Sequence, residues 1–376
     1  MNSLAPSQNP PGGLPVSRVP MFFTVGFDDN GFSGLRDPDV PWGITWASRL
    51  FASRKNPSGT GNSRTYDGCP CRVTFYYTTE YISGEHVIDP PDMVKQSWHT
   101  AYKTGHEAGN HSHNHPEGVQ FSVSDWEREI ERCNTWLQKS PPAEDTGMDG
   151  SDPSKGAGIA PAHITGFRAP FIAYNNAMFT ALQNKGFIYD SSIQEGWQPD
   201  QDGTNYFWPY TLDKGSPGND LTAEMGISPP LSDHPGLWEI PVYTVVVPPD
   251  ELCPQYGVST GFRAKMKQID PSFNIENGKI TGIDWNILVE YKMTKEEYLA
   301  TLQYTLDLRI SGNRCPFILG AHSDMYSPGY DFPPNISWQK RQEALEEFVC
   351  YALSKPAVRI VTVQEILDWI RNPVLL

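Results

Sequence analysis

Short apolar runs alternate with stretches of helical periodicity along most of the chain. The apolar runs have the length of strands and occur at 21–27, 72–78, 163–168, 187–189, 237–247, 316–321 and 358–361. Apolar residues recur with helical spacing at 41–53, 92–105, 124–140, 176–185, 294–310, 337–353 and from 362 onward. This strand-then-helix order predicts a parallel sheet with helices on the outside, either an open doubly wound sheet or a closed barrel.

Capping signals support several of the predicted helices. Ser124 and Glu127 have the spacing of a capping box, and so do Thr294 and Glu297. Gly186 is expected to end the helix before it, because glycine favours the C′ position. The sequence therefore predicts where two helices begin and where one ends.

Three internal stretches lack this regularity. Residues 140–160 are dominated by Gly, Pro, Ser and Asp, and residues 194–235 and 250–290 show weak periodicity. We expect surface loop insertions at these places. Residues 1–20 are rich in proline and lack the apolar segment of a signal peptide, so they are expected to form a flexible lead-in. A single domain over 21–376 is expected after it, because βα barrels exceed the usual domain size.

Reactive side chains gather at the carboxyl ends of the predicted strands. They are Asp28, Asp29, Arg168, Asp190 and His322. The active sites of βα barrels are built in this way, from several strand ends on one face. The expected fold class is therefore α/β, a distorted or incomplete (β/α)7 barrel with long surface loop insertions.

A dense run of histidines is the strongest chemical signal in the chain. Four of the nine histidines lie within ten residues, at His106, His111, His113 and His115. Each ring nitrogen of a buried imidazole needs a partner, so this density favours metal ligation, with an exposed polar loop as the alternative. Two histidines four residues apart can reach one ion, and a carboxylate completes a three-ligand site.

Asp29 is the best candidate for that carboxylate. His111 and His115 are the predicted histidine ligands, and His111 with His113 is the competing pair. Pro116 disfavours helical geometry in the residue before it, so His115 is expected in a tight loop or at a helix end. The other two histidines of the run are expected to lie outside the ligand set.

Two classes of enzyme hold an ion with two histidines and one carboxylate. In the jelly-roll non-haem iron oxygenases the carboxylate lies close to the first histidine, whereas Asp29 lies far upstream in a β/α pattern. Hydrolysis is therefore favoured. Asp28, beside the predicted ligand, is the candidate general base, and His322 is the candidate proton donor to the leaving group.

Composition narrows the range of partners. A formal charge of −15 without a basic cluster disfavours nucleic acid and fits a neutral or cationic substrate. The chain is 38% apolar and 12% aromatic, which describes a globular protein, and no apolar run has the length of a membrane span. Six cysteines form an even set, which predicts three disulfides of open pairing and a secreted protein.

Five segments resemble successive motifs of a known enzyme family. They are Phe27-Asp28-Asp29, His111-Ser112-x-x-His115, Arg168-Ala169-Pro170-Phe171, Asp190 and the apolar run into His322. Their order and spacing are similar to those of the polysaccharide deacetylases, carbohydrate esterase family 4. Further segments, GCPCRVTFYYTTEYISG, GFIYDSSI and WPYTLD among them, resemble the chitin deacetylase branch typified by arthropod cuticle enzymes.

The resemblance implies a metal site and its ligands. Asp29, His111 and His115 would bind a divalent metal, zinc in the first place, with cobalt or nickel as alternatives. Gly26 and Asn30 flank the aspartate pair where many relatives have Thr and Gly. This departure removes no reacting group.

The resemblance also implies the catalytic roles. Asp28 would be the base, oriented by Arg168, and His322 would be the acid, tuned by Asp190. The backbone amide of Phe171 would join the metal in stabilising the oxyanion. Ser323-Asp324 follows the predicted acid and supplies a second carboxylate that could compete with Asp190.

The implied activity is metal-dependent removal of N-acetyl groups from N-acetylglucosamine polymers or oligomers, with release of acetate. The alternatives are deacetylation of peptidoglycan or acetylxylan, and a catalytically weak carbohydrate-binding protein. The expected partner is a carbohydrate polymer or oligosaccharide outside the cell, with no nucleic acid and no membrane span, and the oligomeric state stays open. Six aromatic residues of the sequence could stack on sugar rings, although each alone is more often core: Trp197, Tyr206, Phe207, Trp208, Trp238 and Trp285.

Overall fold

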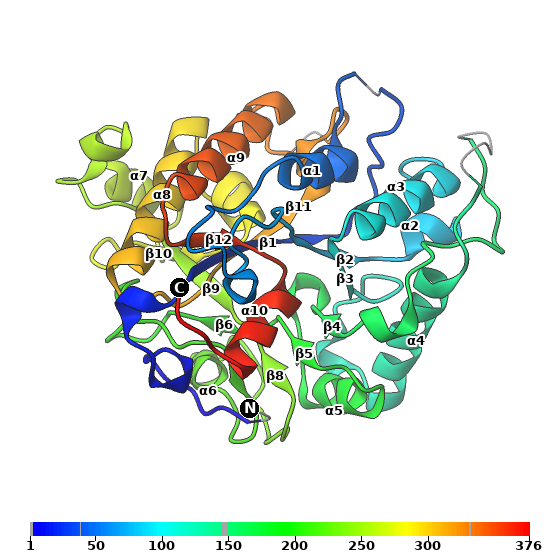
Figure 1. The fold of residues 1–376 in the computed structure, drawn as a ribbon, viewed down its shortest axis with the longest axis horizontal. Helices are drawn as coiled ribbons and strands as arrows, with labels where there is room; N and C mark the ends of the chain where they lie inside the picture. Colours follow the sequence, from blue (N-terminus) through cyan, green and yellow to red (C-terminus); the bar gives the residue numbers. More distant parts are fainter. Residues whose placement is uncertain (1–2, 38, 144–148, 331) are drawn as a thin grey trace.

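The structure is a computed structural model that describes residues 3–37, 39–143, 149–330 and 332–376. Its main sheet contains seven consecutive parallel strands in the order β11-β1-β2-β3-β4-β5-β8, and β7 adds an antiparallel edge (Figure 1). The strands are β1 Met21–Asp28, β2 Thr74–Tyr77, β3 Glu107–Asn110, β4 Gly166–Phe167, β5 Tyr189–Asp190, β7 Tyr210–Thr211, β8 Trp238–Glu239 and β11 Phe317–His322. The prediction of an α/β fold built on an incomplete (β/α)7 barrel is confirmed.

A smaller sheet continues the curl beside β11. It contains β10 (Lys279–Thr281), β9 (Val242–Val246) and β6 (Gln194–Glu195), in that order. A parallel bridge between Ile283 and Gly320 joins the segment after β10 to β11. On the edge of β1 opposite β11, β12 (Val358–Ile360) pairs with the first three residues of β1. The two sheets therefore adjoin without closing into one continuous ladder.

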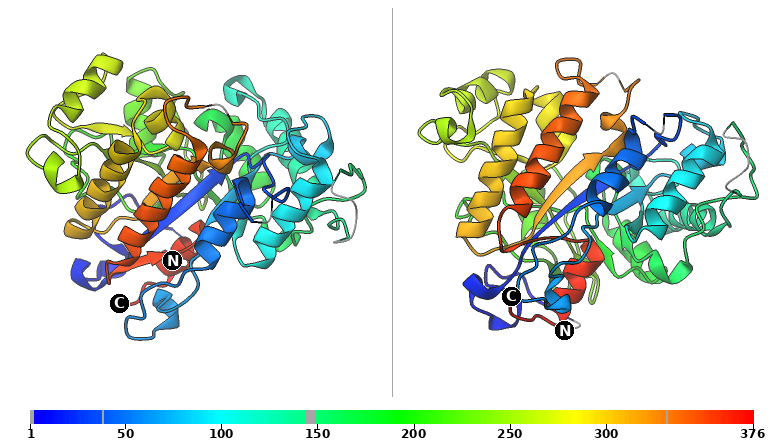
Figure 2. Two further views of the ribbon diagram at one scale, coloured as in Figure 1. Left: turned by 90° about the horizontal axis from the view of Figure 1, so that it is seen from above. Right: turned by 45° about the horizontal axis from the view of Figure 1, so that its top comes forward.

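Helices are arranged around the curled sheet (Figure 1). They are α1 Gly43–Ala52, α2 Glu80–Ser83, α3 Pro91–Lys103, α4 Val123–Gln138, α5 Asn176–Asn184, α6 Pro217–Glu224, α7 Phe262–Ile269, α8 Lys295–Ser311, α9 Trp338–Leu353 and α10 Val363–Arg371. Short helices are η1 Pro11–Gly13, η2 Val16–Arg18, η3 Ser63–Thr65, η4 Gly118–Gln120, η5 Pro161–His163, η6 Pro170–Ile172, η7 Cys253–Tyr256, η8 Trp285–Glu290 and η9 Ser323–Tyr326. Figure 2 shows α8, α9, α1 and α3 in one row along the strands.

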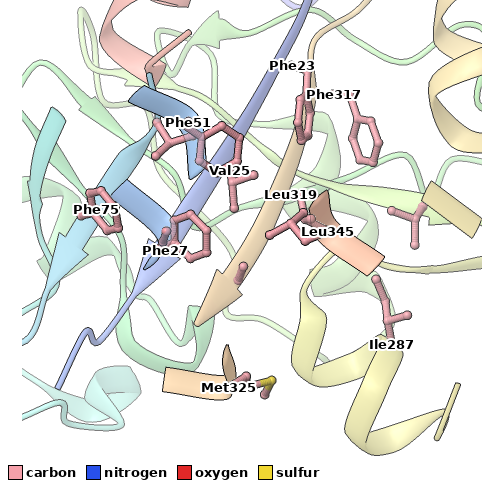
Figure 3. Packing of buried hydrophobic residues seen from close by; sticks show 14 of the residues in the cluster. Phe23, Val25, Phe27, Phe51, Phe75, Ile287, Phe317, Leu319, Met325 and Leu345 are labelled. Carbon is pink, nitrogen blue, oxygen red and sulfur yellow. The ribbon is translucent and has the colours of Figure 1, made fainter. Parts of the chain in front are cut away.

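Strand β1 lies at the centre of the packing. All eight of its residues are buried, because β11 and β2 flank it and both of its faces are covered. The Phe27 and Phe75 rings stack at 5.3 Å between centroids, and Phe23 meets Phe317 at 5.4 Å (Figure 3). This packing fixes the strand whose carboxyl end carries the aspartate pair.

One predicted helix start is displaced by two residues. The capping box of α4 is formed by Ser122 and Asp125, and not by Ser124 and Glu127. The Ser122 hydroxyl accepts from the Asp125 amide, and the Asp125 carboxylate accepts from the Ser122 amide, so the same reciprocal chemistry begins earlier. The capping box of Thr294 and Glu297 is confirmed.

Proline divides one predicted strand into two. The run 237–247 becomes β8 in the main sheet and β9 in the smaller sheet, with Pro241 between them. Proline has no backbone N–H to donate to a ladder, so it marks the point where the chain changes sheets. The predicted strand 163–168 is likewise shorter, because η5 occupies its start and only Gly166–Phe167 pairs as β4.

The segments predicted as loops contain short elements of their own. Residues 194–235 include β6, β7 and α6, and residues 250–290 include η7, α7, β10 and η8. Strand β3 was not predicted, because its sequence Glu-Ala-Gly-Asn has no β-branched or aromatic residue. It is a strand through its pairing with β2 and β4.

The segment before β1 makes contacts with distant parts of the chain. The amides of Trp208 and Thr211 donate to the carbonyls of Ser7 and Leu4, at 2.9 and 2.8 Å. The flexibility predicted for residues 1–20 and the single domain predicted after them stay predictions. Among the described residues, no helix combines the length and apolarity that crossing a membrane requires.

The prediction of three disulfides is wrong for this structure. All six cysteines have free thiols, and all six belong to the described part of the chain. The buried thiols lie in separate packing environments, where Cys133 donates to the carbonyl of Tyr77, Cys253 to that of Pro248 and Cys315 to that of Phe207. The even number of cysteines therefore does not indicate disulfide bonds in this structure.

Candidate active site

The carboxyl ends of several strands meet at one cavity of about 380 Å³. Asp28, Asp29, His111, His115 and His322 all line it. The register explains why, since Asp28 at the end of β1 is the direct partner of His322 at the end of β11. Strand-end geometry thus brings together residues that are far apart in sequence, as βα barrels do.

Three of these residues form a group that could hold a metal ion. The Oδ1 atom of Asp29 lies 3.8 Å from Nε2 of His111 and 3.3 Å from Nε2 of His115. One ligand atom from each residue lies within 4.8 Å of the other two. No other group of this kind is found in the residues that the structure describes. Two nitrogens and one oxygen in this arrangement suit a divalent cation with open coordination positions.

A backbone contact orients His111 toward the group. Its Nδ1 atom donates to the carbonyl of Arg168 at 2.7 Å, which leaves the lone pair of Nε2 facing Asp29. Burial lowers the pKa of His111 to about 4. The imidazole is therefore neutral near neutral pH, as metal ligation requires.

Asp29 is held in its ionised form. Burial alone would raise its pKa, but the attraction of His115, His111 and His322 outweighs burial and lowers it. The hydroxyl of Thr78 also donates to Oδ1, at 3.2 Å. The carboxylate therefore combines a negative charge with a fixed orientation.

Backbone strain is concentrated at this cavity. Nine described residues other than glycine have positive φ, and six of them lie on the segments that build the site: Asp29, Asn30, Ser112, His115, Phe171 and Ile172. Non-glycine residues in this region cost free energy and persist only where the surroundings fix them. At the histidine loop, hydrogen bonds from the Ser112 amide to Asn110 Oδ1 and from the His115 amide to Ser112 Oγ supply this support. His115 lies in a tight loop, which is the conformation that Pro116 predicts.

The other two histidines of the run have separate partners. His106 contacts the carbonyl of Ser48 through Nε2 and the amide of Val73 through Nδ1. His113 contacts Thr79 Oγ1 at 2.8 Å and Glu85 at 3.2 Å. The structure thus brings His111 together with His115 and leaves His106 and His113 outside the group.

Arg168 fixes the orientation of Asp28. Its Nη1 donates to Asp28 Oδ1 at 2.9 Å, and both side chains are buried. Its Nε and Nη2 donate to the carbonyl and hydroxyl of Ser191 at 2.9 and 3.1 Å, and its guanidinium lies 4.4 Å from the centre of the Tyr76 ring. Burial lowers the pKa of Arg168, but the Asp28 carboxylate and smaller effects of other neighbours together raise it by more, so the pKa lies above its ordinary value. The guanidinium therefore stays charged and the ion pair is maintained.

Gly26 leaves the room that this guanidinium occupies. A Cβ atom at position 26 would lie 2.7 Å from Nη1 of Arg168. We therefore expect Gly26→Ala to destabilise the protein by about 1–3 kcal/mol, the usual cost of overpacking a core. Denaturant unfolding tests this, with the exposed Ser259→Ala as control; equal stability of the two variants would contradict the steric role of Gly26.

His322 has a carboxylate partner that the sequence did not predict. Its Nδ1 lies 2.7 Å from Oδ1 of Asp284, and its backbone amide donates to Oδ2 at 2.9 Å. Burial lowers the pKa of His322, but the adjacent Asp284 carboxylate, with smaller effects from Asp29 and Asp28, raises it to about 10. This contact corrects the predicted pairing of His322 with Asp190.

Asp190 supports the neighbouring loop from inside the sheet. It is the register partner of Glu239, and its carboxylate accepts from the amide and hydroxyl of Ser192, both at 2.9 Å. Ser192 Oγ in turn accepts from the amide of Ala169 at 2.8 Å. Burial raises the pKa of Asp190 above its ordinary value. Strand β5 is separated from β11 by four strands, which explains why Asp190 does not reach His322.

Asp284 was missed because it lies in a segment without clear periodicity. It reaches the site through the bridge between Ile283 and Gly320, a contact between distant residues that no local pattern reports. The available signal was the short run Lys279–Thr281, which is β10, followed closely by a carboxylate. Asp324, considered as a competitor for the partner role, instead accepts from the amides of Gly31 and Phe32.

Phe171 has an unusual conformation at the edge of the cavity. Its φ is 57°, the residue is 64% exposed, and its ring centre lies 4.5 Å from that of His115. Within the described residues, no hydrogen bond involves its amide nitrogen. Phe171 also lines the cavity. Of the six aromatic residues considered for sugar stacking, Trp285 lines this cavity, while Tyr206, Trp208 and Trp238 are core residues.

Comparison with known proteins identifies the relatives of the chain. Residues 70–146, which include both histidines of the metal group, match the family model described as polysaccharide deacetylase. The resemblance to polysaccharide deacetylases is confirmed. The chain is 22% identical to chitin deacetylase 8 of Bombyx mori over 370 residues, which are 98% of this chain and 75% of that protein.

Two solved structures are also similar to the chain. A candidate polysaccharide deacetylase from Mycobacterium smegmatis is 17% identical, with a TM-score of 0.48, over 98% of this chain and 95% of that chain. The Xyl-CE4 domain of a multidomain xylanase from the hindgut metagenome of Trinervitermes trinervoides is 12% identical, with a TM-score of 0.37, over 92% of this chain and 89% of that chain.

Proposed function

We propose that the chain is a metal-dependent hydrolase that removes N-acetyl groups from N-acetylglucosamine polymers or oligomers, with chitin or chitooligosaccharide as substrate. The similarity to polysaccharide deacetylases supports a hydrolase that acts on a polysaccharide. The observation that carries the proposal is the presence of Asp29, His111 and His115 in one cavity with Asp28 and His322. A metal group, a base and an acid are the parts that amide hydrolysis requires.

The donor set fits a divalent metal. Two imidazole nitrogens and a carboxylate oxygen suit zinc, with cobalt and nickel as alternatives. The contact between His111 Nδ1 and the Arg168 carbonyl is the outer support that ligating histidines usually have. When bound, such an ion polarises a carbonyl and lowers the pKa of water.

The surrounding residues move the protons. Asp28, held by Arg168, accepts a proton from the water that attacks the acetyl carbon. The amide N–H of Phe171 donates to the oxygen on which negative charge develops, a contribution of roughly 3 kcal/mol for a preorganised donor. His322, protonated near neutral pH, gives its proton to the departing nitrogen as the C–N bond breaks. Acetate and a free amine are the products.

Loss of Asp284 is expected to change the pH dependence of this step. With Asp284 present the pKa of His322 is about 10, so the acid is protonated at pH 7 to 9. In Asp284→Asn that pKa falls, the imidazole loses its proton at lower pH, and the alkaline limb of the kcat profile moves toward neutral pH. We expect a loss of kcat of roughly 100-fold at pH 8, the lower end of the range of about 10²–10⁴ for proton-transfer catalysis. Acetate release measured from pH 5 to 10 tests this, and an unmoved alkaline limb would refute the assignment.

The substrate is tested by direct comparison. Acetate release from chitohexaose, acetylxylan and peptidoglycan separates the proposed activity from deacetylation of another glycan. Release from chitohexaose is expected, and no release from any amino-sugar substrate would overturn the proposal. Binding without release would favour a carbohydrate-binding protein. Secretion remains part of the proposal because glycan polymers of this kind lie outside cells, although the free cysteines give it no support.

A further inference from the structure

One wall of the cavity has chemistry that the proposed reaction does not use. It is formed by η8, a π-helix in which the amide of Tyr291 donates to the carbonyl of Asn286, five residues earlier. Trp285, Asn286 and Glu290 of this segment all line the cavity. Single π-helical turns recur at functional sites, where they change which side chains reach a ligand.

Glu290 is the one carboxylate of the described lining without a charged partner. Asp28 is paired with Arg168, and Asp29 belongs to the group that could hold a metal ion. Glu290 accepts only from the neutral amide of Asn286, at 2.7 Å, and its side chain is exposed. No lysine or arginine is among the described residues that line the cavity.

The neighbouring surface suits a sugar ring. Trp285 is 38% exposed, and its ring centre lies 6.4 Å from that of Phe332, which is 54% exposed. An exposed indole offers an apolar face to the C–H groups of a sugar and attracts a cation above its ring. On the same wall of the cavity, the Glu290 carboxylate and the Asn286 side-chain amide can form hydrogen bonds with a ligand.

We propose that Glu290 binds the protonated amino group of a glucosamine unit next to the N-acetylglucosamine unit that reacts. This inference rests on the proposed function. Deacetylation converts a neutral amide into an amine that is cationic at neutral pH. A partly deacetylated oligosaccharide therefore carries the positive charge that could pair with the Glu290 carboxylate. The favoured substrate class is therefore oligosaccharides that contain both acetylated and free amino sugars.

If Glu290 binds this amine, the enzyme should prefer partly deacetylated oligomers over fully acetylated ones, a preference that an uncharged cavity wall would not give. An exposed ion pair of this kind changes affinity by about two- to fivefold, so kcat/KM should be higher by that factor for the mixed oligomer than for the fully acetylated one. The preference should shrink as salt is raised, because the carboxylate is open to solvent.

The test compares two tetrasaccharides on three proteins. Fully acetylated chitotetraose and chitotetraose with one free amine are supplied to the wild type, to Glu290→Gln and to Glu296→Gln. Glu296 is an exposed residue of α8 outside this cavity and controls for the loss of one surface charge. We expect a kcat/KM ratio of two to five for the wild type and for the control, and a ratio near one for Glu290→Gln. A wild-type ratio of one, or an unchanged ratio in Glu290→Gln, would overturn the inference.

A binding measurement keeps this inference separate from the activity. Calorimetry with the glucosamine tetramer, which has no acetyl group to release, measures the contribution of Glu290 without turnover. We expect Glu290→Gln to raise the Kd about two- to fivefold relative to the wild type. Equal Kd values would overturn the role of Glu290. The absence of acetate release from both acetylated oligomers would instead overturn the proposed function.

Discussion

Removal of the divalent cation with a chelator should abolish acetate release from chitohexaose, and added zinc should restore it. Asp29, His111 and His115 are the three residues whose ligand atoms converge, and the ion that they would hold would supply the Lewis-acid polarisation of the carbonyl. We expect a loss of at least about 10⁴-fold, because activation of both water and carbonyl disappears together. Metal content measured by atomic absorption should fall and recover in parallel with activity.

Variants of the histidine run give this prediction a matched control. His111→Ala removes one of the converging ring nitrogens and should lose both the metal and the activity. His113→Gln alters a histidine two residues away that contacts Thr79 and Glu85, so it should keep the metal stoichiometry of the wild type. Full activity in the metal-free protein would refute the mechanism, and loss of metal in the His113 variant alone would refute the choice of ligands.

The aspartate pair and His322 were predicted from strand ends, whereas the two histidine ligands were predicted from the density of histidines in one short segment. A continuous apolar run identified β1, and its end placed Asp28 and Asp29 at the carboxyl edge of the sheet. His322 was placed in the same way by the run of β11, which is the register partner of β1. Parallel strands share one carboxyl edge, so residues identified separately meet there without further information.

The partner of His322 could not be predicted in that way. Asp284 follows a strand of three residues and reaches the site through a single bridge to β11. Asp190, chosen by resemblance, lies at a strand end as expected, but the order of the sheet separates β5 from β11. Periodicity reports which residues face the core, and it carries no information on which strands become neighbours.

Strands that the sequence missed, or predicted too long, were also decided by contacts between distant segments. Strand β3 has no strong strand former and depends on β2 and β4 for its conformation. The predicted strands 163–168 and 187–189 correspond to β4 and β5, which are only two residues long in the sheet. Tertiary pairing, which overrides weak local preference, decided these segments.

Replacement of Asp28 by asparagine is expected to reduce kcat by about 10²–10⁴-fold, the range for loss of a general base. The amide keeps the size of the side chain and cannot take the proton of the attacking water. Metal binding should be retained, because Asp28 is not among the three converging residues. Initial rates of acetate release and metal content, measured on the same preparation, test both parts, and unchanged activity would refute the assignment of the base.

The same substitution also leaves a buried cation without its partner. Arg168 is fully buried and paired with Asp28, and loss of one member of such a pair costs about 3–5 kcal/mol of stability. Lower activity could then come from a disturbed fold, so a second variant is needed. Asp28→Asn combined with Arg168→Gln removes both charges and should recover part of the stability. If the base is what was lost, the double variant stays inactive despite the recovered stability, whereas recovered activity would show that Asp28 acts only as the counter-ion of Arg168.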